Sequence, residues 1–174
     1  VPLVFSLAAC GSSSNGNGDS KKITIGVVGN ETANQVLKDE AAKQGITIEY
    51  SEFTDYAQPN PAVDAGDNDM NRFQHIAYLA NYNVSSGKDL QIVGSTNIYP
   101  MAIFSKKHKK VDEIPQGGTI AIPNDSVNEA RALLLLKAQN LVTFKSEVHT
   151  PTHNDIDTGK SKVKVTPVDA AQTV

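Results

Sequence analysis

Arg131 is the residue of this sequence best suited to hold a small anion. It lies on the second turn of a predicted helix that begins near Ser126 and runs through the leucines at 133–136. A helix start offers free backbone N–H groups and a positive dipole end, and a guanidinium offers a planar fork to a carboxylate. Together they predict a small-anion site, with an ordinary strand, turn and helix carrying a surface arginine as the alternative interpretation.

The residues before this helix predict a strand that leads into it. Residues 119–122 form a short apolar run, and Pro123 ends it because proline cannot donate to a sheet ladder. Asn124, Asp125 and Ser126 can all accept hydrogen bonds from the free N–H groups of a helix start, and Ser126 followed by Glu129 fits a capping box. The anion site is therefore expected at the carboxyl end of a strand.

A second group of residues could bind an apolar side chain. Phe73, His75 and Tyr78 lie close together near the expected end of another strand, and two rings with an imidazole suit a wall for an apolar or thioether group. A helix that packs Phe73 and Tyr78 into the core, with His75 as a spacer, is the alternative. The loop at 54–60 also follows a strand, where open α/β sheets bind ligands.

The elements that position these residues predict an α/β fold. Residues 21–28 and 46–53 read as strands on either side of a helix that starts at Thr32 or Asn34, which implies a right-handed crossover and a parallel pair. Further along, the pattern predicts a helix over 79–86 ended by Gly87, a strand over 90–94, an extended run over 97–105 and a strand over 162–167.

Composition argues against several classes of protein. With 16 Lys and Arg against 19 Asp and Glu, the chain lacks the basic, aromatic-rich character expected of a nucleic-acid-binding protein. Four lysines at 106, 107, 109 and 110 are interpreted as a solvated loop. No nucleophile elbow, phosphate-cradling glycine loop, zinc helix or other cofactor motif is found. A metal site at His149 and His153 is disfavoured because Pro151 opposes a shared helix face.

The N-terminus predicts a lipid anchor. Residues 1–9 are apolar with small residues at their end, as in the remnant of a signal peptide, and 7–10 (LAAC) resembles a bacterial lipobox. Cys10 is the only cysteine, so we expect it to be lipidated, followed by a flexible polar tether to residue 21. This arrangement predicts a protein anchored at the extracytoplasmic face of the cell membrane.

The chain as a whole resembles the NlpA family of lipoproteins, the methionine-binding subunits of bacterial ABC importers. The matching segments follow the family's order and cover nearly all of the chain after the tether. They are the lipobox at Cys10, 53–60 (FTDYAQPN), 73–75 (FQH), 100–101 leading to 105–107 (SKK), 121–125 (AIPND), 128–136 (NEARALLLL), 155–156 (DI) and 169–172 (DAAQ).

The resemblance implies a two-lobed, periplasmic-binding-protein-like α/β fold of type II. A composition change near Ser105 predicts lobes at 22–104 and 105–174. Family members continue beyond the segment at 169–172, so the second lobe is expected to be incomplete in this chain.

The same resemblance implies the residues of a ligand site. Arg131 would pair with the ligand carboxylate with Asn128 nearby, and the ligand side chain would be walled by Tyr56, Phe73, His75 and Tyr78. Asn97 and Tyr99 stand where family members often carry His and Glu, which leaves the contacts of that loop open.

The function expected is capture of L-methionine, a related amino acid or a methionine-containing dipeptide. Two lobes would close on it by hinge motion and deliver it to the permease and ATPase subunits of an ABC importer, with no cofactor. A surface lipoprotein adhesin that uses the lysine cluster is one alternative. A hydrolase that uses His75 with Asp55 or Asp69 is a weaker one, because no nucleophile is apparent.

Overall fold

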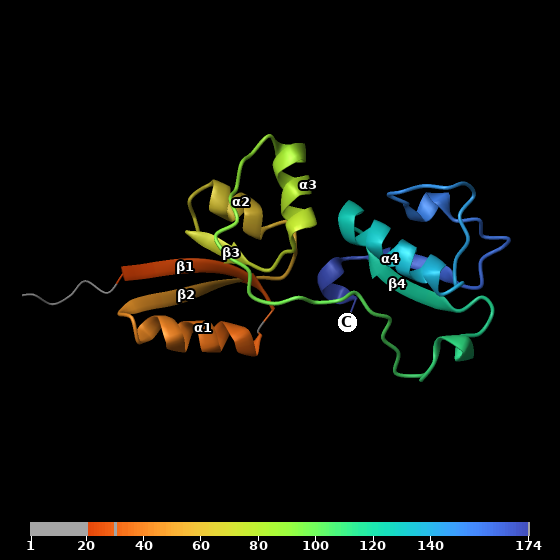
Figure 1. Cartoon of the computed structure of the whole chain (residues 1–174), viewed down its shortest axis with the longest axis horizontal. Helices are drawn as coiled ribbons and strands as arrows, with labels where there is room; N and C mark the ends of the chain where they lie inside the picture. The colour runs from red at the N-terminus through yellow and green to blue at the C-terminus, as the bar shows by residue number, and fades with distance from the viewer. Residues whose placement is uncertain (1–20, 30, 174) are drawn as a thin grey trace, which may run out of the picture.

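The described residues form two separate β-sheets, each packed with its own helices (Figure 1). The structure is a computed structural model, and it describes residues 21–29 and 31–173. The predicted signal remnant at 1–9, the lipidation site at Cys10 and most of the tether lie outside the described residues. We refer to the first sheet with helices α1, α2 and α3 as lobe 1, and to the second sheet with helix α4 as lobe 2.

The sheet of lobe 1 is parallel throughout. Strand β1 (Lys21–Val28) lies between β2 (Ile46–Phe53) and β3 (Met70–Arg72), in the order β2-β1-β3. The register places Lys21 opposite Ile46 and Ile25 opposite Met70. The predicted β-α-β opening and its parallel pair are therefore confirmed.

Helices cover both faces of this sheet. Helix α1 (Thr32–Ala42) lies on one face, while α2 (Pro59–Asp64) and α3 (Ile76–Ser86) lie on the other (Figure 1). Burial on both faces explains the apolar run in β1, where Ile25 and Val27 are almost fully buried against Ile48 of β2. Gly87 ends α3 in the left-handed conformation, as predicted.

Lobe 2 has a two-stranded parallel sheet. Strand β4 (Thr119–Pro123) pairs with β5 (Lys164–Val168), and α4 (Ser126–Ala138) packs against β4. Short 3-10 helices cover Val111–Glu113, His153–Asp155 and Ala170–Gln172. The core of this lobe is larger than that of lobe 1 and centres on Ile122 with the fully buried Leu133 and Leu136 of α4.

Residues 88–110 join the two sheets without forming a helix or strand. The prediction of a strand over 90–94 was therefore wrong, and the run predicted as extended over 97–105 does not join either sheet. A strand needs a neighbour that bonds to its N–H and C=O groups, and none of the described strands pairs with this segment. Val93 and Ile98 are accordingly exposed, whereas Met101 and Ile103 pack on the core of lobe 2. The predicted lobe boundary near Ser105 falls within this connecting segment and stays a prediction.

The start of α1 also differs from its prediction. Glu31 occupies the N-cap position and no side chain caps the helix. Asn34 is buried instead, and its side chain accepts a hydrogen bond from Arg72 Nη1 at 2.7 Å. The amide is thus used between elements rather than at the helix end.

Among the residues that the structure describes, no helix has the length and apolar character needed to cross a membrane.

Candidate functional site

The residues predicted to wall a ligand side chain follow the carboxyl ends of two strands. Tyr56 lies in the loop after β2, and Phe73 comes directly after β3. His75 is the N-cap of α3, where its Nδ1 accepts a hydrogen bond from the backbone N–H of Tyr78 at 3.2 Å. Strand ends and a helix start thus bring all four residues to one edge of the lobe 1 sheet.

Three of these residues form a closed aromatic cluster. The ring centroids of Tyr56, Phe73 and Tyr78 lie 5.6, 5.7 and 6.2 Å apart, and every pair meets edge to face. The hydroxyl of Tyr78 donates to the backbone carbonyl of Tyr56 at 3.1 Å. Edge-to-face pairs stabilise each other beyond their burial, so the cluster is a preformed apolar wall with one polar tip already satisfied.

A polar chain connects this wall to lobe 2. The Oδ1 of Asn128 accepts a hydrogen bond from Arg131 Nη1 at 2.8 Å and lies 2.8 Å from His75 Nε2. Because His75 Nδ1 already accepts a hydrogen bond, its Nε2 carries the proton and donates to Asn128. All six residues predicted for the site therefore come together in one contiguous set that joins the two lobes.

The start of α4 is capped by a different residue from the one predicted. Asp125, not Ser126, is the N-cap, and its Oδ1 accepts from the Asn128 backbone N–H at 2.9 Å. Its Oδ2 accepts from the Asn128 side-chain amide at 3.1 Å. The capping box was wrong because Glu129 is turned to His153, accepting from its backbone N–H at 2.7 Å and contacting Nδ1 at 2.6 Å.

Carboxylates surround the aromatic cluster. Burial raises the pKa of Tyr78 to about 12, and the charges of Asp125, Asp55 and Asp169 add to the effect. Burial also raises the pKa of Tyr56, followed by the charges of Asp125, Glu31 and Asp169. Both effects keep the two phenols protonated, so they can donate hydrogen bonds.

Arg131 is the cation of the site. Its guanidinium is partly buried, and within the described part of the chain it forms no ion pair with any carboxylate. By contrast, Arg72 of lobe 1 is paired with Glu31 at 2.9 Å. A guanidinium held by one amide oxygen keeps donors available for an anion.

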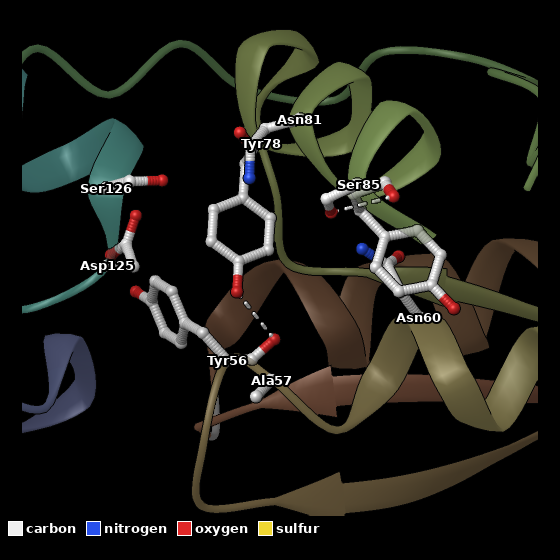
Figure 2. A pocket seen from close by; sticks show the side chains of 9 residues that line it. Tyr56, Ala57, Asn60, Tyr78, Asn81, Ser85, Asp125 and Ser126 are labelled. Carbon is white, nitrogen blue, oxygen red and sulfur yellow. Dashed lines mark hydrogen bonds between the residues drawn. The ribbon is translucent and has the colours of Figure 1, made fainter. Parts of the chain in front are cut away.

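A pocket of about 190 Å³ lies beside the cluster, between the two lobes. Figure 2 shows Asp125 and Ser126, at the start of α4, across from Tyr78 and Asn81 of α3. Of the six predicted residues, Tyr56 and Tyr78 line this pocket, whereas Phe73, His75, Asn128 and Arg131 lie outside its lining. The full lining is Tyr56, Ala57, Asn60, Tyr78, Asn81, Tyr82, Ser85, Asp125 and Ser126.

Sequence reasoning missed two of these lining residues in particular. Asp125 was expected only as a polar residue of the helix start, because an aspartate before an apolar helix is the ordinary N-cap signal, and that signal does not place it beside a pocket. Asn60 is almost fully buried, but it stands between Pro59 and Pro61, so no local pattern distinguishes it from an exposed turn residue.

Comparison with known proteins agrees with this architecture. The model of the NlpA lipoprotein family matches residues 23–174. A Vibrio cholerae protein named probable D-methionine-binding lipoprotein MetQ is 39% identical over 170 residues, which cover 95% of this chain and 62% of that protein. The Escherichia coli K12 D-methionine-binding lipoprotein MetQ is 37% identical over 177 residues, covering 98% of this chain and 64% of that protein.

Solved structures give the same match. The substrate-binding protein of a methionine transporter from Streptococcus pneumoniae has a TM-score of 0.76 and 38% identity, covering 87% of this chain and 63% of that one. A nutrient-binding protein from Burkholderia cenocepacia, bound to methionine, has a TM-score of 0.77 and 38% identity. The match covers 86% of this chain and 65% of that one. This chain therefore spans less than two thirds of the length of these relatives.

Proposed function

Since this chain belongs to the NlpA lipoprotein family, we propose that it is a substrate-binding protein whose ligand is methionine. The ligand would lie between the lobes, with its carboxylate on Arg131 and its side chain against the aromatic cluster. Relatives named for D-methionine binding, and a similar structure bound to methionine, support this choice.

One observation carries the proposal. A guanidinium that has no ion pair among the described residues and a cluster of three rings lie on different lobes. The hydrogen-bonded chain from Arg131 through Asn128 to His75 connects them. An amino acid with an apolar tail has a carboxylate for the first and a side chain for the second. The thioether of methionine suits aromatic edges because sulfur is polarisable.

The site would bind its ligand without changing it. Charge-assisted pairing at the guanidinium and burial of the side chain would supply the affinity. No side chain near the cluster is arranged as an activated nucleophile in the part of the chain described, since His75 directs both ring nitrogens to other partners. Delivery to a permease would follow closure of the lobes around the ligand.

Anchoring through Cys10 is the remaining part of the proposal. The lipobox and the polar tether support it, as do relatives named as lipoproteins. The protein would then act at the extracytoplasmic face of the membrane, close to its permease and ATPase partners.

Calorimetry with the two enantiomers of methionine tests the ligand. We expect saturable binding of at least one enantiomer, and weaker binding of alanine, which has the same charged groups but only a methyl side chain to place against the rings. Equal affinity for alanine and methionine would contradict the role given to the aromatic cluster. If neither enantiomer gives a heat of binding, this result would contradict methionine as the ligand.

A further inference from the structure

Three primary amides of lobe 1 form a hydrogen-bonded network. Asn60 of α2 and Gln74 bond reciprocally, with Asn60 Nδ2 donating to Gln74 Oε1 at 2.9 Å and Gln74 Nε2 donating to Asn60 Oδ1 at 2.6 Å. Asn71 of β3 donates to the same Asn60 oxygen at 2.8 Å and to the Pro59 carbonyl at 3.3 Å. Gln74 Nε2 also donates to Asn71 Oδ1 at 3.1 Å.

Asn60 is the centre of this network and the most buried member. It is only 1% exposed, and it takes part in three of the hydrogen bonds between the amides. Its oxygen accepts two of them and its nitrogen donates one, so the network needs an acceptor at one end of the side chain and a donor at the other. Removing this side chain would leave Gln74 and Asn71 with unsatisfied groups in a partly buried place.

The network connects the segments that carry the aromatic cluster. Gln74 stands between Phe73 and His75 in the chain, and Asn60 follows the loop that carries Tyr56. Tyr56 is in turn held to Tyr78 through its backbone carbonyl. A shift of Gln74 would therefore move the ring of Phe73 and the imidazole that contacts Asn128.

We propose that Asn60 is a positioning residue for the ligand: through Gln74 and Asn71 it fixes Phe73, His75 and the Tyr56 loop in the arrangement that meets Arg131 across the two lobes. The proposal rests on the proposed function, because it assigns Asn60 to the same ligand site. Asn60 acts through its neighbours, since its amide is engaged by Gln74 and Asn71.

Asn68 offers a matched control in the same lobe. It is 4% exposed, and its side chain accepts a hydrogen bond from Ser51 of β2 at 2.7 Å. It is thus a buried, hydrogen-bonded asparagine whose described side-chain bond does not involve the amide network. Loss of its side chain should destabilise lobe 1 without releasing the aromatic cluster.

The test compares Asn60→Ala with Asn68→Ala in the full chain, at a temperature where both are folded. Calorimetry would measure affinity for methionine and for 2-aminobutyrate, whose shorter side chain reaches less of the rings. We expect Asn60→Ala to weaken methionine binding by roughly tenfold and 2-aminobutyrate binding by less, and Asn68→Ala to change both by less than about threefold. Aromatic NMR should show the ring contacts of Phe73 with Tyr56 and Tyr78 lost only in Asn60→Ala.

Other outcomes separate the two proposals. Equal loss of affinity for both ligands in Asn60→Ala and Asn68→Ala, with ring contacts intact, would overturn the positioning role. If the unaltered protein binds no methionine, the proposed function fails, and the ring contacts alone then decide whether Asn60 holds the cluster. Should Asn60→Ala not fold, the less buried Gln74→Ala removes the partner amide and must give the same selective loss.

Discussion

Asn128 is the residue at which the two halves of the site meet. Its side-chain oxygen accepts hydrogen bonds from Arg131 of the same helix and from His75 of lobe 1. Its backbone and side-chain nitrogens both donate hydrogen bonds to the Asp125 carboxylate. With every polar atom of the amide engaged, its orientation is fixed, and so is the direction of the guanidinium that bonds to it. The positive charge of the site is thus aimed by the same residue that joins the lobes.

Replacement of Arg131 by alanine tests the proposed carboxylate pairing. We expect methionine affinity to fall at least about tenfold, which corresponds to about 1.5–3 kcal/mol for a charge-assisted pair. Lys137→Ala is the control, because it removes a positive charge from the last turn of the same helix, where the ammonium lies 5.2 Å from the Phe144 ring centroid. Unchanged affinity in Arg131→Ala, measured by calorimetry, would remove this residue from the site.

The phenol of Tyr78 makes the free energy of unfolding fall as the pH rises through the alkaline range. Its pKa rises from 10.0 to about 12 in the folded protein, so the fold favours the protonated phenol. The stabilisation that comes from the protonated phenol is fully present below pH 10 and is lost as the pH rises toward 12. The side chain is partly open to solvent, which reduces the expected effect to the order of 1 kcal/mol.

Tyr78→Phe is the variant for this measurement. It keeps the ring but removes the ionisable group and the hydrogen bond to the Tyr56 carbonyl. The difference in unfolding free energy between wild type and variant, from denaturant titrations, should shrink between pH 10 and 12. A constant difference over that interval would show that the phenol titrates equally in the folded and unfolded chains.

At the scale of elements, the start of α4 shows how a local pattern and a tertiary contact compete. Ser126 and Glu129 have the spacing of a capping box, yet Asp125 caps the helix and Glu129 binds His153, which lies 24 residues further along. A cap signal shared by three adjacent polar residues does not say which one has the extended backbone of the N-cap. That choice depends on where the strand ends, which was predicted one residue short.

Two substitutions test which residue caps α4. Asp125→Ala should lower the unfolding free energy by about 1–2 kcal/mol, because the first turn loses its acceptor and the Asn128 amide loses a partner. Ser126→Ala should cost under about 0.5 kcal/mol, since it changes the first helical residue only. Equal costs in thermal or denaturant unfolding would mean that Asp125 is not the principal cap.

The sheets were predictable where a strand's partner follows closely in the sequence. The alternation in β2 and the apolar run of β1 led directly to the parallel pair, because the helix between them leaves only one crossover. The six proposed site residues were named from a resemblance to a family, and the structure brings them together, whereas the Asn60 network was not foreseen. Reciprocal amide bonds between α2, β3 and residue 74 have no local signature, since they depend on packing between elements.

At the scale of the whole molecule, the two lobes meet through few described contacts. They share the hydrogen bond between His75 and Asn128 and the packing of α3 near α4, and the segment over 88–110 joins them (Figure 1). An interface held by so few groups suits two bodies that move relative to each other, as hinge closure requires. A ligand that contacts both Arg131 and the aromatic cluster would add to this interface and bias the lobes toward closure.

Limited proteolysis tests this arrangement. Four exposed lysines lie at 106, 107, 109 and 110 of the connecting segment, whose backbone is outside any helix or strand, so trypsin should cut there first. The expected early products are two fragments that divide near residue 106. Methionine at saturating concentration should slow this cleavage, because closed lobes restrict the segment that joins them.

A variant with all four lysines changed to glutamine is the control for the cleavage site. It should survive the trypsin concentration that divides the wild type, while keeping the same affinity for methionine, because none of these lysines belongs to the site. First cuts within the helices of lobe 1 would contradict a mobile connection between stable lobes. Identical cleavage rates with and without bound methionine would mean that the ligand leaves the connection unchanged, and closure would then have to occur without constraining residues 88–110.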